Sequence, residues 1–162
     1  MTRELQEKLE SYQRVWAEVD LDAIWENMVH MKENIAEKTK ILAVIKTDGY
    51  GHGGVPIAKM LEQLDFMFGY AAATYEEAHV LREAGVKKPI LILGYTFPYC
   101  YEELIREEIR PAVYRRDTVE ELVAAAAKVG QKAKVHIKVD TGMGRIGITP
   151  DEEGLEFVRF LM

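Results

Sequence analysis

The sequence is poor in the features of secreted, membrane-spanning and nucleic-acid-binding proteins. One cysteine, Cys100, occurs among 162 residues, so no internal disulfide can form and a reducing compartment fits. No apolar stretch approaches the roughly 18 residues of a membrane-spanning helix. Asp and Glu outnumber Lys and Arg by 27 to 21, whereas nucleic-acid-binding domains usually present a basic face. We therefore expect a cytoplasmic protein with no membrane or nucleic-acid partner, and we assign no metal site.

The two ends of the chain suggest a polar extension and an interrupted domain. Residues 1–14 are charged throughout and lack the apolar centre of a signal peptide. The remaining stretch, 15–162, has a length that suits one domain or part of a larger one. The last predicted helix reaches Met162 without a glycine, an asparagine or another stop signal. We expect residues 15–162 to be a truncated domain.

Strand and helix patterns alternate along this stretch. A strand-like piece at 15–19 precedes a helix that Asp20 can cap, with an apolar face reaching Ile35. Five strands are then predicted, each followed by a helical pattern: 41–46, 66–73, 89–94, 110–115 and 133–140. Such alternation indicates an α/β fold, a parallel sheet covered by helices. An open doubly wound sheet fits it, and so does a (β/α)8 barrel, of which five units form a little over half.

Local signals mark where several helices begin. Thr74 with Glu77, and Asp117 with Glu120, have the spacing of capping boxes. Pro150 is predicted at the first position of the last helix, where proline is favoured. These signals support the boundaries of the second, fourth and fifth β/α units.

The stretch ILAVIKTDGYGHGG places a cation, Lys46, at the end of an apolar strand. In α/β folds the carboxyl end of a strand is where ligands bind. A lysine that simply reaches into water is the alternative. Burial on both faces of the strand would lower the pKa of the amine, and a neutral amine can form a Schiff base with a carbonyl. Pyridoxal phosphate is the commonest biological carbonyl partner of this kind.

The glycines after Lys46 lead towards a helix N-terminus, a place suited to phosphate. Tyr50 offers a hydroxyl there, and His52 either supports the site or makes a structural hydrogen bond. Gly49, Gly51 and Gly54 also match the G-x-G-x-x-G dinucleotide pattern. That match is weak, because three residues intervene after the strand and the next strand ends in AAAT without an acid. A Rossmann-type nucleotide binder remains a third hypothesis.

A second group of polar residues lies in HIKVDTGMGRIG. Strand alternation places His136, Lys138 and Asp140 on one face. Charged residues on a buried face are unfavourable in an open sheet, but in a barrel they can point into the lumen beside a site. Arg145 follows in a glycine-rich loop, and its fork of donors suits a carboxylate or a phenolate oxygen.

Together, the segments WAEVDLDAI, AVIKTDGYGHG, EEAHVLREAG, PILILG and KVDTGMGRIG resemble the alanine racemases, fold-type III pyridoxal-phosphate enzymes. The resemblance covers nearly all of the chain from about Trp16. It implies a partial (β/α)8 TIM-type barrel whose C-terminal half and β-domain are absent. Thr47 and Asp48 depart from the usual alanine and asparagine, which alters the polarity of the loop beside the cofactor.

The resemblance also implies roles for individual residues. Lys46 would carry pyridoxal 5′-phosphate as an aldimine and then act as the base that deprotonates D-alanine. Tyr50 would bind the phosphate. Arg145 would contact the phenolic oxygen of the cofactor and the carboxylate of the substrate. Lys138 matches a position that is carbamylated in many members, with His52, His136 and Asp140 as candidates for a supporting layer.

The resemblance further implies what this chain lacks. The second base of the family is a tyrosine from a C-terminal β-domain, contributed across a homodimer. Racemisation needs groups on both faces of the substrate carbon, so we expect the isolated chain to be inactive. The parent would supply D-alanine for peptidoglycan. A non-catalytic pyridoxal-phosphate-binding protein of the same barrel family, or a serine/alanine racemase, are the alternatives. Exposed sheet edges would favour self-association.

Overall fold

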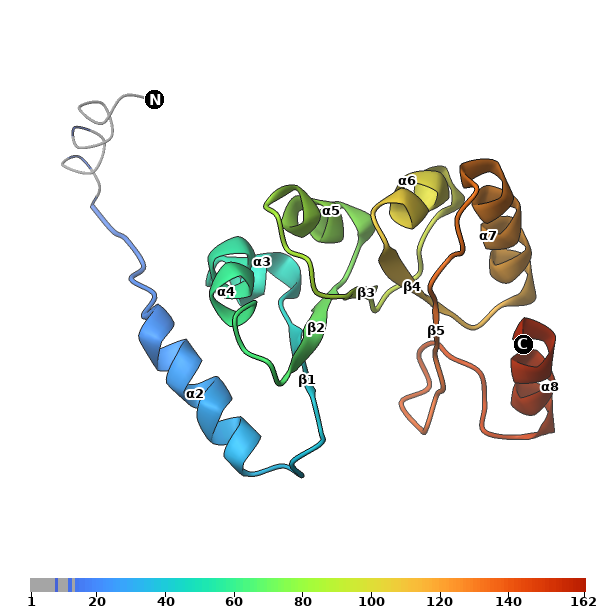
Figure 1. Cartoon of the computed structure of the whole chain (residues 1–162), viewed down its shortest axis with the longest axis horizontal. Coiled ribbons are helices and arrows are strands. Elements are labelled where there is room, and N and C mark those ends of the chain that lie inside the picture. The colour runs from blue at the N-terminus through green and yellow to red at the C-terminus, as the bar shows by residue number, and fades with distance from the viewer. Residues whose placement is uncertain (1–7, 9–11, 13) are drawn as a thin grey trace.

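The computed structural model describes residues 8, 12 and 14–162, in which one parallel sheet is flanked by helices (Figure 1). The strands are β1 (Ile41–Val44), β2 (Met67–Ala72), β3 (Ile90–Ile92), β4 (Ile109–Val113) and β5 (His136–Ile137). The helices are α2 (Leu21–Glu33), α3 (Lys46–Tyr50), α4 (Gly54–Leu61), α5 (Tyr75–Glu83), α6 (Tyr101–Arg106), α7 (Arg116–Val129) and α8 (Glu152–Leu161), with a 3-10 turn, η1 (Pro98–Cys100), before α6. None of the helices in this described part is long and apolar enough to cross a membrane.

The order of the strands decides between the two predicted architectures. Each strand pairs in parallel with the next one along the chain, in the order β1-β2-β3-β4-β5. A doubly wound sheet instead reverses its strand order at a switch point, which the Rossmann hypothesis requires. The sequential order therefore confirms the partial TIM-type barrel and contradicts the Rossmann hypothesis.

Side-chain contacts show that the sheet is curved. Arg110 of β4 lies over the ring of Phe68 of β2, with 5.5 Å between the guanidinium carbon and the ring centroid. The ring of Phe68 also meets His136 of β5, 6.3 Å between centroids. Neighbouring strands lie about 4.8 Å apart, so a flat sheet would hold β2 and β5 roughly 14 Å apart. The inner face of the sheet thus curls as in a half-barrel, with α4 to α7 along the other side (Figure 1).

The apolar core is centred on the middle strands. Tyr70, Ile90, Ile109 and Val113 are fully buried, and burial of such a side chain stabilises the fold by roughly 1.5–3 kcal/mol. The strand before Lys46 was predicted to be buried on both faces, and this is wrong. Val44 is 42% exposed, because β1 lies at the edge of the sheet that residues 14–162 form, with β2 as its one neighbouring strand there.

Two of the predicted helix starts are confirmed. Asp20 accepts a hydrogen bond from the backbone N–H of Ala23 at 3.0 Å and caps α2. The hydroxyl of Thr74 accepts from the N–H of Glu77 at 3.4 Å and caps α5. The reciprocal half of the Thr74 capping box is absent, since the carboxylate of Glu77 bonds elsewhere, as described below.

Two other predicted helix starts are wrong. Arg115, not Asp117, precedes α7, and Asp117 lies in the first turn, where it accepts from Thr118 N at 2.7 Å and pairs with Arg115. Asp151 caps α8 by accepting from Gly154 N at 3.0 Å, so Pro150 lies before the helix. The residues that precede the two helices, Arg115 and Asp151, have the extended backbone that an N-cap position requires.

The ends of the predicted elements also need correction. Residues 15–19 form no strand, because they lie away from the sheet and have no strand to pair with; Trp16 is 70% exposed (Figure 1). Helix α2 ends at Glu33, and Ile35 lies beyond it. The predicted strand 133–140 is regular only at His136–Ile137. The predicted extension 1–14 lies mostly outside the described residues.

Candidate active site

Lys46 directly follows Ile45 at the carboxyl end of β1, where the sequence predicted it. Ile45 is buried and continues the ladder by donating its N–H to Ala71 O at 2.9 Å. The side chain of Lys46 is partly buried, and its ammonium lies over the ring of Tyr50, 5.7 Å from the centroid. Tyr50 itself is 60% exposed. An amine and a phenol therefore lie together at the end of the first strand.

The turn after Lys46 is left-handed. Thr47 (φ 55°, ψ 47°), Asp48 (φ 51°, ψ 50°) and Gly49 (φ 63°, ψ 37°) have positive φ angles, and so do Tyr50 and Gly51. The left-handed conformation costs roughly 1–2 kcal/mol for each residue that has a β-carbon. Asp tolerates it better than most residues, whereas a β-branched residue such as Thr47 is a clear outlier.

Hydrogen bonds around Asp48 hold this turn in place. Gly49 N donates to Ile45 O at 2.9 Å, and Gly53 N donates to Asp48 O at 2.9 Å. The carboxylate of Asp48 accepts from Gly54 N, the first residue of α4, at 2.7 Å. The segment after Lys46 is thus a compact, hydrogen-bonded turn. An acid already occupies the N-terminus of α4, which a phosphate would otherwise use.

The side chain of His52 hydrogen-bonds to the backbone of this turn. Its Nδ1 lies 3.0 Å from Gly49 O and 3.2 Å from Tyr50 O. Carbonyl oxygens only accept, so Nδ1 carries the proton. This is the structural hydrogen bond that the sequence left as one alternative for His52.

Glu77 joins the lysine turn to the neighbouring strand. Its Oε1 accepts from Thr47 N at 2.9 Å, and its Oε2 accepts from Ala73 N at 2.8 Å. Hydrogen bonds to a charged group contribute roughly 1.5–3 kcal/mol each, enough to offset the strain at Thr47. Sequence reasoning missed this contact. The signal was a glutamate at the third position of α5, which we interpreted as half of a capping box.

The loop after β5 is organised by Asp140. Its Oδ1 accepts from Gly142 N at 3.0 Å and from Gly144 N at 3.1 Å. These N–H groups hold the pKa of the Asp140 carboxyl below its usual range. Arg145 follows on this loop with an exposed side chain. The structure therefore gives Asp140 the task of shaping the loop that carries Arg145.

His136 and Lys138 lie earlier in the same segment. His136 faces the inside of the curve against Phe68, and burial, aided by nearby Arg110, lowers the pKa of its imidazole. Lys138 is partly buried, and its N–H donates to Val113 O of β4 at 2.9 Å.

The structure does not join the two predicted groups. Strands β2, β3 and β4 separate β1, which ends at Lys46, from β5, which leads to Arg145. Within the described residues, no hydrogen bond or ion pair links the side chains of Lys46, Tyr50, Lys138 and Arg145. Both groups nevertheless follow the carboxyl ends of their strands, as the barrel prediction requires.

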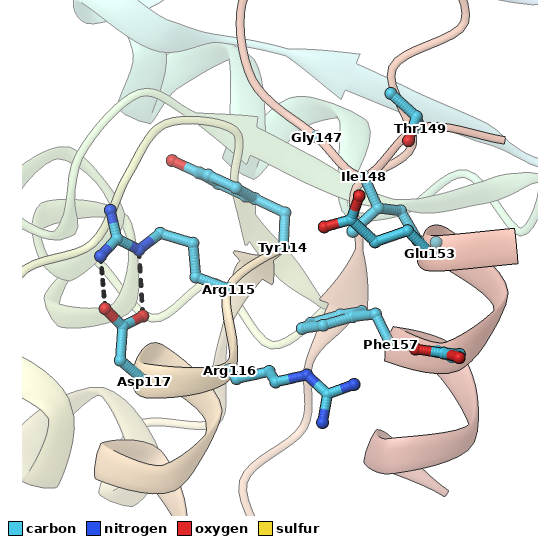
Figure 2. Close-up of a pocket in the computed structure, with 11 residues that line it drawn as sticks. Tyr114, Arg115, Arg116, Asp117, Gly147, Ile148, Thr149, Glu153 and Phe157 are labelled. Carbon is cyan, nitrogen blue, oxygen red and sulfur yellow. Dashed lines mark hydrogen bonds and ion pairs between the residues drawn. The ribbon is translucent and has the colours of Figure 1, made fainter. Parts of the chain in front are cut away.

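A hollow that sequence reasoning missed lies beyond β4 (Figure 2). It has a volume of about 690 Å³ and lies between the loop that begins α7 and residues 147–154, which include the start of α8. Arg115 is held there by two hydrogen bonds to Asp117 (Figure 2). Arg116 lies over Phe160, 4.8 Å from the ring centroid. None of the predicted site residues lines this hollow.

The fold and the lysine together define a class, the (β/α) barrels that carry a lysine at the end of their first strand. The family model described as "Alanine racemase, N-terminal domain" matches residues 19–162. The chain therefore belongs to the alanine racemase N-terminal domain family.

Individual relatives agree with this assignment. The chain is 42% identical over 155 residues to "Alanine racemase 1" of Oceanobacillus iheyensis, covering 95% of this chain and 41% of that protein. It is 49% identical over 144 residues to "Alanine racemase" of Clostridium perfringens, covering 89% of this chain and 37% of that protein. The chain thus spans about two fifths of the length of these relatives.

Solved structures give the same result. An alanine racemase of Clostridium difficile 630, in complex with cycloserine, superposes with a TM-score of 0.89 at 39% identity, covering 93% of this chain and 41% of that one. A histidine racemase from Leuconostoc mesenteroides subsp. sake superposes with a TM-score of 0.78 at 27% identity, covering 87% and 37%. The neighbours therefore include racemases that act on different amino acids.

Proposed function

We propose that this chain is the lysine-bearing part of an alanine racemase that uses pyridoxal 5′-phosphate. The observation that carries the proposal is the position of Lys46, partly buried at the carboxyl end of the first barrel strand and over the ring of Tyr50. The family match across residues 19–162 supports the same reading.

The residues present fit such a cofactor. A primary amine is the group that forms a Schiff base with an aldehyde, and Lys46 offers one at the ligand-binding edge of the sheet. The hydroxyl of Tyr50 and the guanidinium of Arg145 are exposed donors after strands of the same sheet, and they suit a phosphate and a phenolate or carboxylate.

Each residue would then have a defined task. When bound, the cofactor withdraws electrons from the substrate and acidifies its Cα–H. Lys46 would bind the cofactor covalently and move a proton at Cα on the face used by D-alanine. Tyr50 would hold the phosphate, and Arg145 would hold the phenolic oxygen and the substrate carboxylate. Lys138 is the candidate for carbamylation.

Three positions would act indirectly. His52 would fix the lysine turn through its bonds to two carbonyl oxygens, and Asp140 would shape the loop of Arg145. His136 would remain neutral on the inner face. These tasks follow from the contacts that each side chain makes.

Racemisation also needs a group on the opposite face of Cα. The resemblance assigns it to a tyrosine of a C-terminal domain from a second copy, in a cytoplasmic homodimer that supplies D-alanine for peptidoglycan. We therefore propose that residues 1–162 alone exchange a Cα proton without producing the other enantiomer.

The covalent step can be tested on the chain itself. The chain is mixed with pyridoxal 5′-phosphate and reduced with borohydride, and the modified lysine is located by mass spectrometry. We expect the label on Lys46 and its loss in Lys46→Ala. Lys59→Ala, which removes an exposed lysine of α4, is the matched control and should still be labelled at Lys46. Labelling spread equally over exposed lysines would contradict the proposal.

The proton step needs a separate assay. In deuterated buffer with the cofactor, we expect the Cα proton of D-alanine to exchange faster than that of L-alanine, with no racemised product. Cofactor binding without any exchange would favour a non-catalytic pyridoxal-phosphate-binding protein.

A racemase for another amino acid is the second candidate function. The histidine racemase among the structural neighbours supports it, because the same partial barrel occurs in an enzyme with a larger substrate. Exchange rates for D-serine and D-histidine, measured beside D-alanine, distinguish the substrates. A rate for D-alanine below either of the others would favour this candidate.

A further inference from the structure

The peptide that follows Lys46 depends on an acceptor from another element. The internal hydrogen bonds of the left-handed turn begin at Gly49 N, which donates to Ile45 O. The N–H of Thr47 takes no part in them and donates to the carboxylate of Glu77 at 2.9 Å. This acceptor comes from α5, which lies beside α3 (Figure 1).

The carboxylate of Glu77 occupies the place of a ladder rung between β1 and β2. The ladder ends where Ile45 N donates to Ala71 O, and β2 ends at Ala72. Beyond this point, the N–H of Thr47 after β1 and the N–H of Ala73 after β2 donate to the two oxygens of Glu77, at 2.9 and 2.8 Å. One side chain thus joins the two strand ends where their backbones diverge.

This contact restrains the backbone next to Lys46. Thr47 N belongs to the peptide unit that begins with the carbonyl of Lys46, so its hydrogen bond fixes ψ of Lys46 and φ of Thr47. Those two angles decide where the chain leaves the strand and enters the left-handed turn that holds Tyr50 beneath the ammonium. A carboxylate accepts both bonds at once, whereas the amide of glutamine has only one acceptor atom.

We propose that Glu77 is a positioning residue for Lys46, holding the lysine turn against the end of β2 so that the amine meets its carbonyl partner. The inference rests on the proposed function of Lys46 and adds a residue to it. Glu77 touches neither substrate nor cofactor in this assignment, because it acts from α5 through the backbone of Thr47.

Three variants distinguish the positioning effect of the Glu77 carboxylate from the effect of its negative charge. Glu77→Gln keeps the size but loses one acceptor. Glu77→Asp keeps the charge but is one methylene too short to reach both N–H groups. Glu76→Gln is the matched control, because the neighbouring Glu76 accepts from Tyr99 and makes no contact with α3 among the bonds of the described residues. Circular dichroism confirms that each variant is folded.

The first readout needs no cofactor. Amide hydrogen exchange, followed by NMR, should become at least tenfold faster at Thr47, Gly49 and Gly51 in Glu77→Gln and Glu77→Asp. Exchange in Glu76→Gln should equal that of the unmodified chain. Unchanged exchange in both Glu77 variants would overturn the proposal, whatever the cofactor does.

The second readout is the covalent reaction of Lys46 with pyridoxal 5′-phosphate. We expect both Glu77 variants to react at least tenfold more slowly, with a shifted pH profile, and Glu76→Gln to react normally. A wild-type rate in Glu77→Asp would attribute the effect to charge and overturn positioning. If the unmodified chain forms no adduct with pyridoxal 5′-phosphate, the proposed function is refuted. Amide hydrogen exchange then decides by itself whether Glu77 holds the lysine turn.

Discussion

The imidazole of His136 and the ring of Phe68 meet edge to face, 6.3 Å between centroids, across the inside of the curved sheet. Two strands, β3 and β4, lie between the strands that carry them. The contact partly buries a titratable group beside Arg110, on the face that would line the barrel.

This burial predicts a pH dependence of stability. Burial and Arg110 lower the pKa of His136, so the unfolded chain binds its proton more tightly than the folded chain does. The stability from neutral His136 is therefore complete above about pH 6.5 and is lost as the pH falls below it. Urea unfolding should show that the free energy of unfolding falls less towards pH 5 in His136→Phe than in the unmodified chain. His30→Phe, at an exposed site in α2, is the control and should behave like the unmodified chain.

Thr47→Gly should stabilise the chain by about 0.5–1 kcal/mol. Glycine adopts a positive φ without strain, and this gain exceeds the added entropy of the unfolded chain. Thr141→Gly is the control, because Thr141 is exposed and its φ is not positive, so the change should be neutral or destabilising. Urea unfolding measures both. A destabilised Thr47→Gly would show that the threonine contributes contacts beyond its backbone.

Gly69→Ala should destabilise the chain by about 1–3 kcal/mol, the range for overpacking. A β-carbon at this position would lie 2.1 Å from Pro89 O, at the start of the β2–β3 pairing. Gly130→Ala is the comparison, because its β-carbon would meet no atom within 4 Å and its cost, roughly 1–2 kcal/mol, comes only from a positive φ of 73°. Thermal unfolding should show the larger loss of stability in Gly69→Ala. A loss no larger than that of Gly130→Ala would mean that β2 and β3 adjust their spacing at little cost.

Asp140→Ala should loosen the loop that carries Arg145. Two backbone N–H groups lose their acceptor, and the segment 141–147 gains conformational freedom. Limited digestion with trypsin should cut after Arg145 several times faster than in the unmodified chain. Glu156→Ala, at an exposed site in α8, is the control. An unchanged cutting rate would show that the loop has other restraints.

Cys100 should react slowly with iodoacetamide. Burial raises the pKa of its thiol to about 11, so little thiolate forms at pH 8. Stability from the neutral thiol is complete below the unfolded pKa of about 8.5 and is lost as the pH rises towards 11. Alkylation should therefore be at least tenfold faster in urea than in the folded chain. Equal rates in the two conditions would contradict burial of the thiol.

The sequence predicted the position of Lys46 because its signals are local. An apolar run, a cation and closely spaced glycines lie within 14 residues, and each has a direct structural meaning. The left-handed angles of Thr47 and Asp48 have no such signal, since neither residue requires them. The acceptor that holds them, Glu77, lies 30 residues away from Thr47.

The strand before Arg145 illustrates the second limit. Alternation over 133–140 predicted eight residues of strand, but β5 pairs with β4 only at His136 and Ile137. Val139 then bridges Ile148, which follows the loop. Periodicity reports which residues suit a strand, whereas the partner that is present decides how far the strand extends.

The sequential strand order bears on how the chain folds during its synthesis. Each strand after β1 finds its partner in the strand made just before it, so the sheet can grow in the order in which the ribosome releases it. The lysine turn is the exception, because the acceptor for Thr47 N is not made until 30 residues later. If Glu77 positions this turn as proposed, Lys46 emerges early but reaches its final orientation only when α5 has formed.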